Sequence, residues 1–135
     1  MSRHNGDIRL RHMLDHAREA VAMASGKTRR ALDSDRQLNL SLVRLLEIVG
    51  EAAGRLPAEE RVRHPDIAWA EIVGLRNRLI HGYDSFDFDI LWQIVSEDLP
   101  PLIVALKRRS IGNRPIRTRR SQLRQKERIR VVARS

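Results

Sequence analysis

The chain has 135 residues, about the length of one domain, and 41% of them are hydrophobic. It contains no cysteine, which excludes a disulfide scaffold, a cysteine-ligated zinc site and a catalytic thiolate. No apolar run approaches the roughly 18 residues that span a bilayer, and the first residues contain no uninterrupted apolar stretch typical of a secretory signal. We therefore expect a cytoplasmic protein that does not associate with membranes.

The net charge of +9 is concentrated at the C-terminal end. Residues 107–135 carry 12 Lys and Arg against one acid, Glu127, which gives +11, whereas residues 1–106 carry 14 bases and 16 acids, which gives −2. The first 106 residues are long enough to form one hydrophobic core. The apolar residues that follow are isolated or paired and cannot offset the entropy of ordering. We predict a helical domain over residues 1–106 and a basic, flexible tail over residues 107–135.

Apolar residues recur at helical spacing throughout the predicted domain. A first helix is predicted over residues 8–25, with Asp7 as its N-cap and Gly26 at its end. A second helix is predicted over residues 35–56, with Ser34 as its N-cap. Both helices carry one apolar stripe, so each needs a neighbour to cover it.

A third helix is predicted over residues 67–81, with Asp66 as its N-cap and Gly82 at its end. A fourth begins near Phe88, and its apolar phase continues across Pro100-Pro101, so we expect a kink or two nearly coaxial pieces there. No segment alternates with a period of two over a useful length. The predicted fold is an all-α antiparallel bundle of four to five helices with short loops.

Arg76 interrupts the apolar stripe of the third predicted helix. The stripe residues within about 60° of Trp69 on an ideal helix are Ile72, Val73, Ile80 and Tyr83. Because an unpaired guanidinium is very costly to bury, Arg76 needs an anionic partner, a cavity or an interface. A structural ion pair with Glu47 or Glu51 of the second helix would satisfy it.

The same segment also has the composition of a phosphate-handling site. The planar fork of Arg76 suits phosphate oxygens, and His81 can exchange a proton near neutral pH. Asn77 shares a flank with His81, and Tyr83 lies seven residues after Arg76. Because RNA carries its own nucleophile in the 2′-OH, a ribonuclease built this way needs no metal.

The segment RNRLIHGY, residues 76–83, resembles the R-x4-H-x-Y motif of the HepT-like toxins in the HEPN ribonuclease superfamily. Gly50-Glu51-Ala52 resembles the GEA of that family. Residues 65–69 resemble the lead-in with Pro, Ile and Trp, and Trp92 and Leu99-Pro100 resemble the later Trp and Leu-Pro. The resemblance covers residues 7–106.

The resemblance implies a HEPN-like helical bundle that forms a homodimer, alone or within a larger hetero-oligomer, with two motif copies across a shared cleft. Arg76 and His81 would be the catalytic residues of an RNA cleavage that needs neither metal nor cofactor, and Asn77 would orient the site. On an ideal helix Arg76 and His81 lie about 140° apart, which one copy alone would not bring together well. The implied substrate is cellular RNA, with tRNA as one candidate.

The resemblance also implies a partner, a minimal nucleotidyltransferase antitoxin, in a type VII-like toxin–antitoxin pair. This partner would adenylylate Tyr83, adding bulk and negative charge beside Arg76.

Two alternatives come from other functional classes. The same fold resembles a non-catalytic, nucleotide-binding or substrate-binding subunit of a nucleotidyltransferase complex, in which Arg76 binds phosphate and His81 is dispensable. The other is a dimeric helical interaction domain in which Arg76 is only structural.

The basic tail lies beyond the resemblance. We expect it to anchor RNA through phosphate contacts, which are salt-sensitive and independent of sequence. The arginines expected to make these contacts are Arg114, Arg117, Arg119, Arg120 and Arg124. Aromatic residues for base stacking are absent from the tail, so base readout is not expected. Docking on an acidic patch of the antitoxin, or a solvated extension with no specific role, are the alternatives.

Overall fold

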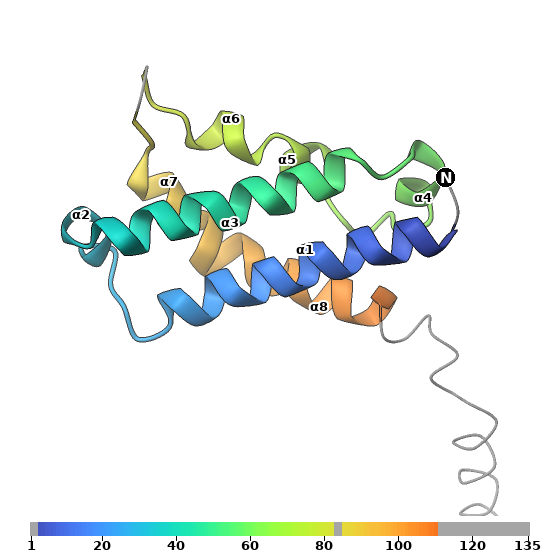
Figure 1. Ribbon diagram of the computed structural model, residues 1–135, viewed down its shortest axis with the longest axis horizontal. Helices are drawn as coiled ribbons and strands as arrows, with labels where there is room; N and C mark the ends of the chain where they lie inside the picture. The colour runs from blue at the N-terminus through green and yellow to red at the C-terminus, as the bar shows by residue number, and fades with distance from the viewer. Residues whose placement is uncertain (1–2, 83–84, 111–135) are drawn as a thin grey trace, which may run out of the picture.

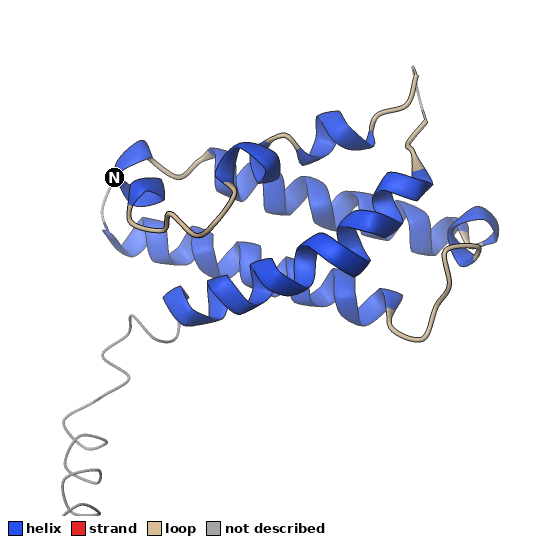
Figure 2. Ribbon diagram, turned by 180° about the vertical axis from the view of Figure 1, so that it is seen from behind, coloured by secondary structure: helices blue, strands red, loops and turns tan. Residues whose placement is uncertain are grey.

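The computed structural model describes residues 3–82 and 85–110. Over these residues all regular elements are helices, which confirms the predicted all-α fold (Figures 1 and 2). Within these ranges the one extended pairing is an isolated antiparallel bridge between Ile80 and Phe86. No helix within the described ranges is long and apolar enough to cross a membrane.

In the described part of the chain, three long helical elements form the bundle and four short helices connect or flank them. The long elements are α1 (Arg3–Ala24), α3 (Arg36–Gly54) and the unbroken succession of α7 (Phe88–Gln93), η1 (Ile94–Asp98) and α8 (Leu99–Ser110). The short helices are α2 (Ala31–Ser34), α4 (Ala58–Val62), α5 (Trp69–Val73) and α6 (Leu75–Leu79). Helix α1 packs along α3 and α8, and the shared core includes the fully buried Leu14, Leu46 and Leu106 (Figure 1).

The first two helices begin at other residues than predicted. Helix α1 begins at Arg3, so Asp7 lies inside the helix and is not its N-cap. Asp35, not Ser34, caps α3 by accepting a hydrogen bond from the backbone N–H of Leu38 at 3.0 Å. A carboxylate is as good a cap as a hydroxyl, and Ser34 is already the last residue of α2. The predicted end of the first helix is confirmed, since Gly26 follows it with a φ of 75°.

The single helix predicted over residues 67–81 is instead two short helices. Helices α5 and α6 are separated at Gly74, whose φ of −85° and ψ of 6° leave the helical region. Glycine is the weakest helix former after proline, which explains why the helix breaks there. Ala68, rather than Asp66, occupies the N-cap position of α5, and α6 ends at Leu79, before Gly82.

Pro100 and Pro101 lie in the first turn of α8, directly after the π-helical turn η1. The missing N–H groups of proline interrupt regular α-helical hydrogen bonding, and the wider π turn absorbs the change. The apolar phase continues across this point, because Leu91, Leu99 and Leu106 are all buried. The predicted coaxial pieces are therefore one continuous element of α7, η1 and α8, which crosses the front of the bundle in the view of Figure 2.

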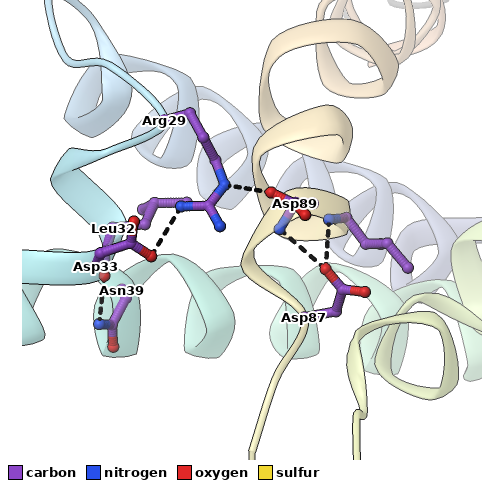
Figure 3. Close-up of polar contacts among 7 residues, drawn as sticks. Arg29, Leu32, Asp33, Asn39, Asp87 and Asp89 are labelled. Carbon is purple, nitrogen blue, oxygen red and sulfur yellow. Dashed lines mark hydrogen bonds and ion pairs between the residues drawn. The ribbon is translucent and has the colours of Figure 1, made fainter.

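Arg29 joins the loop after α1 to the start of α7 (Figure 3). Its Nε donates to Asp89 at 2.6 Å, and its Nη1 donates to Asp33 at 2.9 Å. These two hydrogen bonds raise the pKa of Arg29 above its ordinary value, and the bond with Asp33 makes the larger contribution. Asp87 caps α7 by accepting from the N–H groups of Asp89 and Ile90 (Figure 3). Together these contacts fix the end of the loop that follows α6.

Candidate active site

Gly50 in α3 allows α5 to approach closely. A Cβ at this position would lie 3.1 Å from the backbone oxygen of Ile72, tighter than nine in ten real contacts of a Cβ. The nearest atoms are backbone, so no side-chain rotation could relieve the overlap. Figure 1 shows α5 and α6 running along α3. The Gly50 position therefore sets the distance between α3 and the segment that carries the R-x4-H motif.

Arg76 pairs with a carboxylate of α3. Its Nε lies 3.4 Å from Oε2 of Glu47, and the side chain of Arg76 is 66% exposed, against 21% for Glu47. Of the possibilities that the sequence left open for Arg76, an anionic partner, a cavity or an interface, the structure shows an ion pair, and of the two carboxylates named its partner is Glu47. Glu51 pairs instead with Arg44, at 3.6 Å.

The prediction that Arg76 lies within an apolar stripe with Val73 and Ile80 is wrong. Because the helix breaks at Gly74, the core is reached by Ile72, Leu75 and Leu79, whereas Val73 and Ile80 are exposed. The guanidinium therefore lies at the surface of α6 rather than within an apolar face, and it is accessible to a ligand.

His81 lies in the loop after α6, not in the last turn of a helix as predicted. Its backbone N–H donates to the oxygen of Ser85 at 2.8 Å, and the hydroxyl of Ser85 donates back to the oxygen of His81. The N–H of Asp87 donates to the oxygen of Leu79 at 2.8 Å. The loop is thus closed by main-chain contacts, and the imidazole of His81 is exposed. Tyr83 lies outside the described residues.

Two further polar residues of α6 face in different directions. Asn77 is exposed, next to Arg76. Arg78 donates from Nη2 to Asp98 of η1 at 3.1 Å, a contact that the sequence reading missed. The only sequence signal for this contact was that Arg78 follows Arg76 by two residues, a spacing that places the two arginines on nearly opposite sides of a helix. Helix α6 is therefore held from both sides, by α3 through Arg76 and by η1 through Arg78.

The family model described as "Ribonuclease HepT-like" matches residues 13–109. The chain belongs to the HepT-like ribonuclease family. A candidate RNase of Methanocaldococcus jannaschii is 32% identical over 102 residues, which cover 76% of this chain and 94% of that protein. A candidate ribonuclease HepT of Thermococcus cleftensis is 40% identical over 68 residues, covering 50% of this chain and 62% of that protein.

A third relative, a candidate RNase of Caldanaerobacter subterraneus subsp. tengcongensis, is 34% identical over 93 residues, covering 69% of this chain and 83% of that protein. No solved structure matches the chain. Membership of the HepT-like family assigns a ribonuclease function to the chain, with RNA as its substrate.

The part of the domain that the structure describes offers no ready ligand set for a metal ion. Among the described residues, no three His, Asp or Glu side chains are grouped so that they could hold one. The paired histidines of α1 contact each other, with the ring centroids of His12 and His16 6.2 Å apart and Nδ1 of His16 2.6 Å from the backbone oxygen of His12. The tail arginines lie outside the described residues, and their role stays a prediction.

Proposed function

We propose that this HepT-like ribonuclease is a metal-independent endoribonuclease toxin that cleaves cellular RNA, tRNA among it, with Arg76 and His81 at the cleft of a dimer. One observation carries the proposal. The guanidinium of Arg76 is paired with Glu47 at Nε, at the base of the fork, while the side chain is two-thirds exposed. A phosphate can therefore approach the terminal amino groups, the part of the fork that binds phosphate oxygens.

The proposed reaction uses the nucleophile that RNA itself carries. His81 accepts the proton of the 2′-OH, the 2′ oxygen forms a bond to phosphorus, and the bond from phosphorus to the 5′ oxygen breaks. The 5′ oxygen leaves with the proton that His81 has taken up. Arg76 stabilises the negative charge on the non-bridging oxygens, and Asn77 orients the substrate. The products are a 2′,3′-cyclic phosphate and a 5′-hydroxyl end.

The test is cleavage of RNA by the purified protein in excess EDTA. We expect the wild type to cleave, and Arg76→Ala and His81→Ala each to lower the rate at least about 100-fold. Arg18→Ala and His12→Ala, at exposed positions of α1, are matched controls and should leave the rate unchanged.

Either of two outcomes would contradict the proposal. Cleavage that survives both Arg76→Ala and His81→Ala would remove the motif from the mechanism. A wild type that never cleaves RNA, yet binds a nucleotidyltransferase tightly, would favour the non-catalytic substrate-binding subunit.

We further propose that a minimal nucleotidyltransferase antitoxin neutralises the toxin by adenylylating Tyr83. An attached AMP would bring negative charge within two residues of His81 and would compete with the substrate phosphate for Arg76. On co-expression with a transferase encoded in the adjacent reading frame, we expect the mass of one AMP on the peptide that contains Tyr83. Tyr83→Phe should carry no AMP and remain toxic, and an unmodified wild type that is nonetheless neutralised would refute the proposal.

A further inference from the structure

A small open groove lies between α5–α6 on one side and η1–α8 on the other. Its volume is about 230 Å³, and its apolar lining includes the buried Ile72, Leu75, Ile94, Leu99 and Leu102. Pockets that enclose small molecules are commonly about 300–1,000 Å³. The groove is smaller and open, so it suits one or two aliphatic side chains of a peptide rather than a cofactor.

The lining of the groove is strongly acidic. It contains the four carboxylates of Asp66, Glu71, Glu97 and Asp98 against the single guanidinium of Arg78, which gives a formal charge of −3. Such a surface repels RNA, because the phosphates and the carboxylates carry the same sign. A fitting occupant is basic and carries isolated aliphatic residues.

We propose that the groove binds residues 116–123 of the same chain, IRTRRSQL, with Ile116 in the apolar part and the arginines against the acidic lining. Residues 111–135, which follow α8, carry 9 Lys and Arg against Glu127, a charge of +8, whereas residues 1–110 carry 17 bases and 16 acids, a charge of +1. The acidic lining therefore favours this segment over the domain of a second copy. Ile116 and Leu123 are seven apart, and so would share one face of a helix formed on docking. The docking does not depend on ribonuclease activity.

Residues 107–110 belong to α8, not to a flexible tail as predicted, and the segment that follows begins close enough to reach the groove. Ala105 of α8 lines it, and α8 ends at Ser110, about 7.5 Å further along the helix axis. Residues 111–115, IGNRP, contain turn-forming Gly, Asn and Pro and can span up to about 17 Å, which is enough to reverse direction. A tether this short gives an effective concentration in the millimolar range, so a weak contact suffices.

The chain contains no native cysteine, so the contact can be mapped with introduced pairs in the full-length protein. Ala68 lines the groove and Ser121 belongs to the docking segment, which makes Ala68→Cys/Ser121→Cys the test pair. The control pair is Ala58→Cys/Ser121→Cys, because Ala58 is exposed on α4, outside the lining and near the end of the bundle from which α8 leads into the tail (Figure 1). Circular dichroism verifies that each variant is folded.

Under mild oxidation, we expect the groove pair to form an intrachain disulfide at least about tenfold faster than the control pair. Equal rates would overturn the proposal. A disulfide that forms only between two chains, tested by mixing the single variants Ala68→Cys and Ser121→Cys, would also overturn it and assign the groove to the tail of a second copy.

Charge is tested in the same background. Glu97→Lys should lower the rate of disulfide formation several-fold, whereas Glu19→Lys, an equal charge change on the exposed face of α1, should not. Equal effects of the two substitutions would contradict a contact guided by the acidic lining.

Discussion

Glu47 holds Arg76 by one edge of the guanidinium, at a distance of 3.4 Å. An ion pair of this exposure contributes only about 0.2–1 kcal/mol. We therefore expect the ion pair to help the proposed cleavage by orienting Arg76, because it restrains a long side chain that would otherwise sample many rotamers at the surface. Glu47 is a positioning residue in this interpretation, and it does not touch the RNA.

Glu47→Gln should accordingly lower kcat for RNA cleavage by a factor of about 1.4 to 5, the loss that corresponds to such a pair, while KM stays the same or falls. KM is not expected to rise, because removing a negative charge near the site favours RNA. Glu51→Gln is the control, since it removes the same charge one turn further along α3, where the partner is Arg44. Equal effects of the two substitutions on kcat would show that only overall charge matters.

The packing of two elements, α3 and α5, depends on one missing side chain at Gly50. Because the obstacle to a Cβ there is the backbone oxygen of Ile72, an added methyl group must move α5 itself. A shift of α5 is carried along the chain to α6 and to Arg76. The position of the motif is thus fixed by the long helix α3 rather than by the short helices α5 and α6, which have five residues each.

Gly50→Ala should lower the free energy of unfolding by about 1–3 kcal/mol, the usual cost of overpacking, and reduce RNA cleavage as well. Chemical denaturation and an RNA cleavage assay measure the two effects. Gly54→Ala on the same helix is the control, because its Cβ would meet only a side-chain carbon of Val73, at an ordinary 3.9 Å. That variant should be as stable as the wild type or slightly more stable. A fully stable and active Gly50→Ala would contradict this account of how α5 is seated.

At the scale of the whole molecule, the two proposed catalytic residues lie in different surroundings, one on a helix and one in a loop. Arg76 is anchored toward α3, whereas His81 lies beyond the end of α6, in a loop closed by its own main-chain bonds. A site that takes Arg76 from one copy and His81 from another is consistent with this arrangement. It agrees with the proposed dimer.

Mixing of inactive variants tests a site shared between copies. Arg76→Ala and His81→Ala should each be inactive alone, but a re-equilibrated equimolar mixture should regain up to about a quarter of the wild-type activity. The reason is that half of the randomly formed symmetric dimers are mixed, and each of these keeps one intact site of two. Light scattering verifies that the variants are dimers. No recovery in verified mixed dimers would place both residues of a site in one chain.

The sequence alone determined the helical class, the stop of the first helix before Gly26 and the start of the last long element near Phe88. It also singled out RNRLIHGY as the candidate site, whose role stays a prediction. These features follow from local rules, because hydrophobic period, cap residues and turn formers act over a few neighbouring positions. The resemblance to HepT-like toxins rested on the order of such motifs, and the family comparison confirmed it.

Only the tertiary structure decided which side of the motif is exposed and what holds it. Glu47 and Glu51 are equally acceptable partners on the sequence, and packing against α3 distinguishes them. The break at Gly74 moved the core face to Leu75 and Leu79, which a period extrapolated through the glycine could not foresee. Long-range contacts choose among locally equivalent arrangements. The net charge of +9 is one example, because the sequence shows where the basic residues lie but only the tertiary structure shows the acidic groove that they could bind.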